Sequence, residues 1–337
     1  MFKNGVGLMG IGALALAAMA CSTPPVDKVA EDSPVLSGPY LGQEPPGLEG
    51  ELFAPGMMST EMDELNAVFL PGGKEVFWSL HLHSMKFVLV HSKEIDGQWT
   101  RPAVASFSGP YSDVDPAVSP DGKRLYYCSN RPRSGSGEPE ANFDIWYVER
   151  THTGWSEPVN AGAPVNSDAD EFYPSFTTDG TMYFQSRRPG CVGGADIYRA
   201  ELVDGEYVEA ECLPETINSE ISEGDAFIAP DESYLIVATR RPEENYGSAD
   251  LYISFRNEDG SWLPLANMGR AVNSEGGENT QILSPCGKYM FYTSRQYKGG
   301  SSDYDSIREA WSKPQNGRGD IYWVDAKIIE QLRDASQ

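Results

Sequence analysis

Carboxylate side chains recur at matching places along this chain of 337 residues, and they are the groups best suited to chemistry. A pair of carboxylates hydrolyses a glycosidic bond when one acts as an acid and the other as a base or nucleophile. The recurring acids are Asp113, Asp115, Asp170, Glu171, Glu223, Asp225 and Glu278. If the chain is an enzyme, we expect its catalytic pair to come from Asp115, Asp170, Glu171, Asp225 and Glu278.

Arginine side chains form a second recurring set, and they come shortly after a Ser or Thr in each copy of the pattern. The members of this set are Arg131, Arg187, Arg188, Arg240, Arg241 and Arg295. We expect each to pair with the Asp that opens the following strand, as Arg131 with Asp144 or Arg240 with Asp250. Recurrence in every copy favours such a structural role. The alternative is a ligand-binding face, where acids and arginines line a polar funnel for a cation, a sugar or a peptide terminus.

An internal repeat predicts the elements that position these groups. One copy runs through Pro116-Ala-Val-Ser-Pro-Asp-Gly, an apolar run, Ser-Asn-Arg, Asp144-Ile-Trp-Tyr and Gly154-Trp-Ser-Glu-Pro. Its turn recurs at positions 71, 120, 178, 230 and 285, with spacings of 49, 58, 52 and 55 residues. Each copy offers four short apolar or alternating runs, which in the second copy are 115–119, 124–129, 144–149 and 154–161. Such a copy has the length and strand number of one β-propeller blade.

The copies predict a closed ring of five blades. The last copy lacks a fourth strand, whereas the segment that begins at Glu51 looks like the end of a repeat whose start is missing. The N-terminal strand should therefore complete the last blade, which removes two open sheet edges. A sixth blade in 298–318 is the alternative, although this stretch is short and polar. We expect an all-β fold, a single β-propeller of four-stranded blades over residues 51–325, and a short C-terminal helical tail over 326–337.

The N-terminal segment predicts export and lipid attachment. An apolar stretch ends in Ala18-Met19-Ala20-Cys21, which resembles the lipobox of bacterial lipoproteins. We expect a signal peptide over residues 1–20, a lipid on Cys21, and a tether rich in Pro, Glu and Gly over residues 21–50. Ser22 after the cysteine favours, by resemblance to Gram-negative lipoproteins, anchoring in the outer membrane with the propeller facing the periplasm.

Charge and cysteine content exclude several classes of function. A formal net charge of −24 argues against nucleic acid, because phosphate contacts need clustered Lys and Arg. The lipid on Cys21 is then the expected contact with a membrane. Cys191 and Cys212 should approach the same face of one blade, so they predict a disulfide in an oxidising compartment. No cofactor is expected, and a metal site is not indicated by the cysteine spacing. A cation bound by the acids of the channel is the alternative.

The repeats resemble those of the TolB-like, WD-like β-propeller family. The resemblance rests on the Ser/Thr-Pro-Asp-Gly turn, the Tyr-Phe strand after it, the Ser-x-Arg segment and the Asp-Ile-Tyr strand, and it covers about residues 51–325. It implies a periplasmic scaffold without fixing a chemistry, because propellers host binding modules and enzymes alike. We therefore expect a monomeric, non-catalytic scaffold that binds an envelope protein, a peptide or a glycan. The alternative is a carboxylate-dependent glycan-cleaving enzyme with its site in the propeller funnel.

Overall fold

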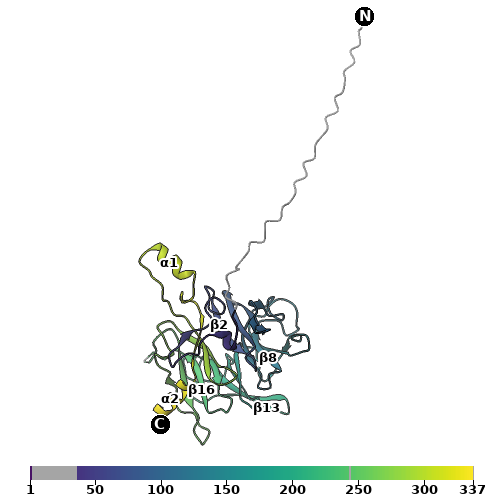
Figure 1. Ribbon diagram of the computed structural model, residues 1–337. Coiled ribbons are helices and arrows are strands. Elements are labelled where there is room, and N and C mark those ends of the chain that lie inside the picture. Colours follow the sequence, from purple (N-terminus) through teal and green to yellow (C-terminus); the bar gives the residue numbers. More distant parts are fainter. Residues whose placement is uncertain (2–35, 243, 337) are drawn as a thin grey trace. The chain divides into compact units, whose positions relative to one another are not determined.

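The computed structural model describes Met1, residues 36–242 and residues 244–336. Most of the predicted signal peptide, the predicted lipid-bearing Cys21 and the first part of the predicted tether lie outside the described residues. From residue 36 onward the described chain is mostly β-structure, in five sheets arranged around a common centre (Figure 1). Among the described residues, no helix combines the length and the apolar character that crossing a membrane requires.

Each sheet is a propeller blade of antiparallel strands, and in every blade the first strand lies innermost. Blade one contains β2 (Glu64–Phe69), β3 (Glu75–His83), β4 (Lys86–Ile95) and β6 (Ala103–Val104), and the short β5 (Gln98–Trp99) also pairs with β4. Blade two contains β7 (Asp113–Val118), β8 (Arg124–Ser129), β9 (Asp144–Glu149) and β10 (Val159–Asn160). Blade three contains β11 (Glu171–Phe176), β12 (Met182–Ser186), β13 (Asp196–Val203) and β14 (Glu206–Cys212).

The last two blades have the same strand order, except that the outermost strand of blade five comes from the N-terminal side of the propeller. Blade four contains β15 (Glu223–Ile228), β16 (Tyr234–Thr239), β17 (Asp250–Phe255) and β18 (Ala266–Asn267). Blade five contains β19 (Glu278–Leu283), β20 (Tyr289–Ser294), β21 (Asp320–Asp325) and, from the other end of the propeller, β1 (Glu51–Leu52).

The pairing of β1 with β21 closes the ring. Glu51 lies opposite Trp323 and Leu52 lies opposite Tyr322 in this antiparallel pair. Each inner strand also contacts the inner strand of the next blade, and β19 returns to β2. The predicted all-β propeller of five blades, completed by its N-terminal strand, is therefore confirmed.

The core is divided among the interfaces between blades. Successive side chains of a strand point to opposite faces of a sheet, so one strand serves two interfaces. In β8, for example, Tyr126 packs toward blade three and Tyr127 toward blade one. The interface that closes the ring is rich in aromatic rings: Phe53 lies 4.9 Å from Trp323 and 5.0 Å from Phe291 between ring centroids. The buried ring of Phe53, directly after the short strand β1, thus holds this strand in place.

Residues 36–50, which composition predicted as part of a tether, lie against the propeller. They include a 3-10 turn at Pro39–Gly42, where Leu41 is 2% exposed. The indole N–H of Trp99 donates to the Gly38 carbonyl at 3.0 Å, and Gly50 donates to the Ala271 carbonyl at 2.8 Å. The structure differs from the predicted tether here because a few apolar residues and backbone hydrogen bonds suffice to fix a Pro- and Gly-rich segment.

Two helices lie outside the blades. α1 (Tyr304–Trp311) falls in the polar stretch 298–318 and begins at a capping box formed by Asp303 and Ser306. It lies in the long connection between β20 and β21, so this stretch adds no sixth blade (Figure 1). α2 (Lys327–Ser336) forms the predicted C-terminal helical tail, and its Ile328 and Ile329 pack into the cluster between blades four and five.

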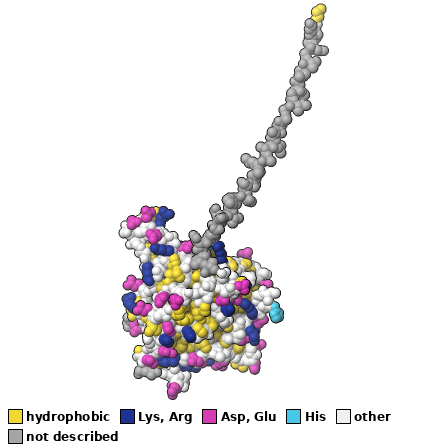
Figure 2. Space-filling view, viewed as in Figure 1, with side chains coloured by type: hydrophobic (Ala, Val, Ile, Leu, Met, Phe, Trp, Pro, Cys, Tyr) yellow, Lys and Arg dark blue, Asp and Glu magenta, His cyan; other side chains and the backbone are white. Residues whose placement is uncertain are grey.

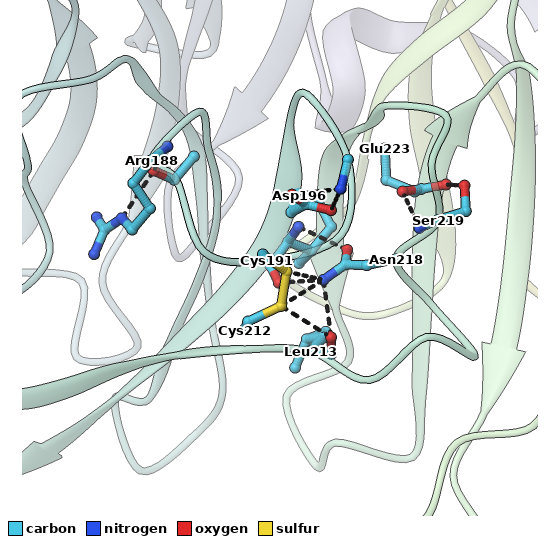
Figure 3. The surroundings of a disulfide bond; sticks show 11 residues. Arg188, Cys191, Asp196, Cys212, Leu213, Asn218, Ser219 and Glu223 are labelled. Atoms are coloured by element: carbon cyan, nitrogen blue, oxygen red, sulfur yellow. Dashed lines mark hydrogen bonds between the residues drawn. A yellow bond between two sulfur atoms is a disulfide. The ribbon is translucent and has the colours of Figure 1, made fainter.

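A disulfide joins Cys191 to Cys212, the pair expected from the sequence, with 5.9 Å between their Cα atoms. It links the loop after β12 to the end of β14 within blade three (Figure 3). The side-chain amide of Asn218 donates to the Leu213 carbonyl at 3.0 Å and to the Cys191 sulfur at 3.3 Å. The loop that carries Cys191 is therefore fixed twice, by the disulfide and by Asn218 in the connection between blades three and four. Cys128 is a buried free thiol.

Candidate functional site

An acid with a buried carboxylate opens every inner strand. These anchor acids are Glu64, Asp113, Glu171, Glu223 and Glu278. In three blades a serine donates to the anchor acid from both its backbone N–H and its hydroxyl, as Ser167 does to Glu171 at 2.9 and 2.6 Å. The preceding Asn166 accepts from the N–H of Ile145 and donates to its carbonyl, both at 2.8 Å. The recurring Asn-Ser-x-x-x-Glu pattern thus ties the connection between blades to two strands.

Arginines supply the positive charge beside three of the anchor acids. Arg131 reaches Asp113 at 3.0 Å, and the two side chains are only 7% and 0% exposed. Equivalent pairs join Arg188 to Glu171 at 3.2 Å and Arg241 to Glu223 at 3.7 Å. Charge-assisted hydrogen bonds of this kind satisfy carboxylates that water does not reach. These predicted site residues are therefore engaged with one another.

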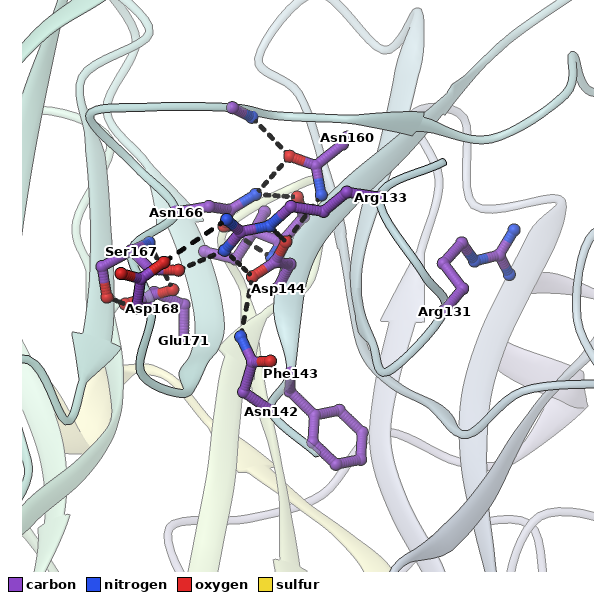
Figure 4. A network of polar contacts seen from close by, with 12 residues as sticks. Arg131, Arg133, Asn142, Phe143, Asp144, Asn160, Asn166, Ser167, Asp168 and Glu171 are labelled. Atoms are coloured by element: carbon purple, nitrogen blue, oxygen red, sulfur yellow. Dashed lines mark hydrogen bonds and ion pairs between the residues drawn. The ribbon is translucent and has the colours of Figure 1, made fainter. Parts of the chain in front are cut away.

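The partner of Arg131 differs from the one expected from the sequence. Asp144 is bound by Arg133, at 2.6 Å from Nε and 2.9 Å from a terminal nitrogen, and Figure 4 shows Arg131 apart from this network. The strand register does not decide between the two acids, because Ser129 lies opposite Asp113 in the β7–β8 pair and opposite Asp144 in the β8–β9 pair. Side-chain contacts make the difference, since the Arg131 guanidinium donates to the Phe107 carbonyl at 3.0 Å as well as to Asp113. Ser129 also accepts from the Arg131 Nε at 3.0 Å, which directs the guanidinium toward β7. The predicted pair of Arg131 with Asp144 is wrong.

Other candidate residues on this loop face lie nearer the solvent. Arg187 lies 3.7 Å from Asp170, with side chains 56% and 31% exposed. Arg240 is exposed, and its expected partner Asp250 accepts from backbone N–H groups. Arg295 binds Asp63 at 2.9 Å. Figure 2 shows a face of the molecule on which acidic and basic side chains are interspersed around apolar ones, as such pairing would produce.

The second residue after each anchor acid belongs to a ring around the channel. These channel residues are Asn66, Asp115, Tyr173, Asp225 and Thr280, with φ between 47° and 55°. Each lies at a β-bulge, which turns its side chain out of the strand ladder. Residues of adjacent blades meet there: Asn66 donates from its N–H to Thr280 at 3.1 Å, and Thr280 donates from its N–H to Asp225 at 3.3 Å.

Sequence reasoning identified two of these channel residues and missed three. Asp115 and Asp225 were candidates because they are acids, whereas Asn66, Tyr173 and Thr280 carry other chemistry. The signal that could have found them is their constant spacing of two residues from an anchor acid. The candidate acids thus divide into three kinds. Four are anchor acids (Asp113, Glu171, Glu223 and Glu278), two are channel aspartates, and Asp170 lies nearer the solvent, where it accepts from the backbone N–H of Phe143.

The two channel aspartates influence each other and differ in exposure, because Asp115 is buried whereas Asp225 is partly exposed. Asp115 is 6% exposed, and the Tyr173 hydroxyl crosses the channel to donate to the Gln281 carbonyl at 2.6 Å. Burial and the neighbouring charge of Asp225 raise the pKa of Asp115 well above its usual value. Burial also raises the pKa of Asp225 to about 6, although the backbone N–H of Thr280 acts in the opposite direction.

This raised pKa predicts a pH dependence of stability. An acid whose pKa is higher in the folded than in the unfolded chain binds more protons when folded, so its contribution to stability declines as pH rises. For Asp225 the decline should fall between its ordinary pKa of 3.8 and about 6. We expect the melting temperature of Asp225→Asn to fall less over this range than that of the native chain, measured by circular dichroism. Asp259→Asn, an exposed carboxylate on a loop, is the control; parallel curves for all three chains would contradict the assignment.

The opposite, turn face carries an apolar mouth of the channel. This turn-face funnel has a volume of about 420 Å³ and takes residues from all five blades. Its apolar lining comprises Val68, Phe69, Pro71, Ala117, Val118, Pro120, Pro174, Phe176, Phe227, Pro230, Ile282, Leu283 and Pro285. The inner strands end here and the Pro-containing turns begin, so the repeat itself builds the funnel. The sequence signal for the funnel is the apolar residue two places before the turn proline, as in Phe69, Val118 and Leu283.

Hydroxyl groups in the funnel wall are already engaged. Ser119 and Thr177 donate to the aspartates of their own turns, and Ser175 donates to the Ala226 carbonyl. Thr178 donates to the Pro230 carbonyl at 2.9 Å. A sugar would meet few free hydrogen-bonding groups on such a wall, whereas an apolar side chain would meet matching surface.

Acidic groups stand beside the funnel. The hydroxyl of Ser119 and the backbone N–H of Lys123 lower the pKa of Asp121, and the hydroxyl of Thr177 and the N–H of Thr181 lower that of Asp179. Both carboxylates are therefore ionised at neutral pH. Lys123 already pairs with Asp121 at 3.2 Å, so it is the apolar wall of the funnel that suits an apolar segment of a ligand.

Comparison with solved structures finds propellers of similar fold. TolB from Acinetobacter baumannii is 16% identical with a TM-score of 0.47, over 78% of this chain and 54% of that chain. A TolB-related structure from Agrobacterium tumefaciens is 17% identical with a TM-score of 0.46, over 72% and 73%. α-L-Arabinofuranosidase from Lactobacillus brevis is 11% identical with a TM-score of 0.44, over 78% and 90%.

These similarities concern the propeller fold, which scaffolds and enzymes share. The chain spans about half the length of the Acinetobacter TolB chain. No protein-family model and no curated protein sequence matches it. The described chain is a five-bladed propeller on the evidence of its own sheet topology.

Proposed function

We propose that the protein is a non-catalytic binding scaffold of the bacterial envelope, which receives an apolar segment of a partner protein in the turn-face funnel. The observation that carries the proposal is the contrast between the two faces. The funnel presents apolar side chains of all five blades around an open mouth. Most of the candidate acids and arginines of the loop face are bonded to one another or to backbone groups, whereas Arg240 is exposed. A partner would therefore gain more from the funnel, where apolar surface is available for burial.

The proposal includes the location inferred from the sequence. A lipid on Cys21 would anchor the chain in the outer membrane, with the propeller in the periplasm as a monomer. The repeated ring of prolines and apolar residues supports a protein segment as ligand in preference to a glycan, because the hydroxyls of the wall donate within the protein.

Val118 provides the test of the funnel. We expect Val118→Asp to lower capture of an isolated envelope partner by about tenfold or more, because it places an unpaired charge against an apolar surface. Val159→Asp is the matched control, since Val159 is 42% exposed on the outer strand β10. Capture is measured with full chains whose melting temperatures agree. Undiminished capture by Val118→Asp, or an equal loss in Val159→Asp, would contradict the proposal.

A second candidate function is glycan cleavage, and the raised pKa values of Asp115 and Asp225 favour it. The burial of Asp115 beside Tyr173 opposes it, since a glycosidase needs both of its carboxylates on an open site. The decisive experiment incubates the full chain with a panel of glycans and peptidoglycan fragments and scores product release. If the native chain releases products and Asp225→Asn abolishes this activity, the protein is an enzyme and the scaffold proposal is wrong.

A further inference from the structure

The two channel aspartates lack a cationic partner at ion-pair distance. Asp115 lies in blade two and Asp225 in blade four, at the same position of the repeat. None of the ion pairs formed by the described residues includes either carboxylate. The Arg295 charge acts on Asp225 from a distance, while its guanidinium is bound to Asp63. One buried and one partly exposed carboxylate therefore belong to the same ring of channel residues without a cationic side chain in contact.

The side chain of Asn66 has a buried oxygen atom without a hydrogen-bond partner. This channel residue is 2% exposed, and its amide nitrogen donates to the carbonyl of Pro116, the residue after Asp115, at 3.3 Å. Its amide oxygen is buried and accepts no hydrogen bond. A buried oxygen without a partner costs about 1–3 kcal/mol, so its presence beside the aspartates requires an explanation.

A second amide repeats the arrangement beside the other aspartate. The Gln281 side-chain nitrogen donates to the backbone carbonyl of Asp225 and, at 2.8 Å, to that of Ile236. Its oxygen is also buried without a partner, and Gln281 is 0% exposed. The Gln281 amide is therefore held between β19 and blade four, so the side-chain oxygens relevant to the channel are those of Asp115, Asp225 and Asn66.

We propose that the central channel binds one Ca²⁺ ion between Asp115 and Asp225, with the amide oxygen of Asn66 as a further ligand. Oxygen atoms of carboxylates and amides are the ligands that Ca²⁺ prefers, and its flexible coordination suits a channel built from different blades. Two carboxylates match the charge of one divalent ion. Among the described residues, no three His, Cys, Asp or Glu side chains come together as a metal site, so the proposed ion takes its third side-chain ligand from the amide of Asn66.

The ion would change the behaviour of both aspartates. Without a cation, burial favours the protonated carboxyl, and the two groups oppose each other's ionisation. With a cation, both carboxylates ionise and the three oxygens gain a common partner. A bound ion would then join blades one, two and four across the axis of the propeller and stabilise the closed ring.

The experiment titrates Ca²⁺ into the full chain in detergent after dialysis against EDTA, and follows heat and melting temperature. We expect one Ca²⁺ per chain, a higher melting temperature with Ca²⁺, and weaker binding of Mg²⁺, which demands stricter octahedral geometry. Asn66→Ala should weaken Ca²⁺ binding by about tenfold or more, because it removes one ligand. Asp259→Asn, the exposed loop control, should bind as the native chain does.

The Asp115→Asn/Asp225→Asn chain separates loss of the site from loss of the fold. It should melt at a higher temperature than the native chain in EDTA, because the buried charges are gone, yet it should not respond to Ca²⁺. A native chain that shows neither binding nor a shift in melting temperature would overturn the proposal. Unchanged Ca²⁺ binding by the double variant would overturn it equally, since the ion would then lie elsewhere.

Discussion

Replacement of Arg131 by methionine should lower the free energy of unfolding by about 3–5 kcal/mol, because it leaves a buried carboxylate without its counter-charge. The Asp113 carboxylate is 0% exposed, and Arg131 also donates to the Phe107 carbonyl at 3.0 Å. Ser108 would remain as a hydrogen-bond donor to Asp113, at 2.8 Å, but it carries no charge. Urea unfolding followed by tryptophan fluorescence measures the loss.

Two further chains test this explanation. Arg187→Met removes an arginine of the same set whose ion pair with Asp170 is largely exposed, so it should cost less than about 1 kcal/mol. Asp113→Asn combined with Arg131→Met removes both charges and should recover part of the lost stability. Equal losses for Arg131→Met and Arg187→Met would show that burial of the ion pair does not set its contribution to stability.

Replacement of Phe53 by alanine should lower the free energy of unfolding by about 3–5 kcal/mol, the range for truncating a buried phenylalanine. Phe53 is 0% exposed, and its ring contacts Phe291 and Trp323 of blade five and Phe69 of blade one. It follows directly on β1, so the vacancy would loosen the strand that closes the ring. Thermal and urea unfolding of the full chain provide the measurement.

The matched control is Val104→Ala on the outer strand β6. Val104 is 53% exposed, and its truncation should change stability by no more than about 0.5 kcal/mol. A loss below about 1 kcal/mol for Phe53→Ala would contradict the importance of this closure, because substitutions in a well-packed core cost more.

The blades could be predicted because the same sequence pattern of strands and turns occurs in several copies along the chain. In blade two the predicted runs 124–129 and 144–149 coincide with β8 and β9, whereas 154–161 shrinks to the short β10. The middle strands are buried and strongly apolar, so their pattern is clear. The outer strand is exposed at Val159 and pairs over only two residues, so composition did not define its limits.

Contacts between elements could not be predicted in the same way. The partner of Arg131 depends on the hydrogen bonds of its guanidinium with Ser129 and with the Phe107 carbonyl, which sequence spacing does not contain. The packing of Leu41 depends on a surface that exists only in the closed ring. The channel ring was partly hidden for a related reason, because a β-bulge shifts which residue of the inner strand faces the axis.

The most direct test of the proposed function compares photo-crosslinking from the two faces of the propeller. A benzoylphenylalanine at Phe176, which lines the turn-face funnel, is compared in cells with one at Arg240, which is exposed on the loop face. The scaffold proposal predicts one discrete protein adduct from position 176, lost in the Val118→Asp chain, and no such adduct from position 240. A discrete adduct from position 240 alone would contradict the proposal and transfer the binding site to the acidic, arginine-lined face.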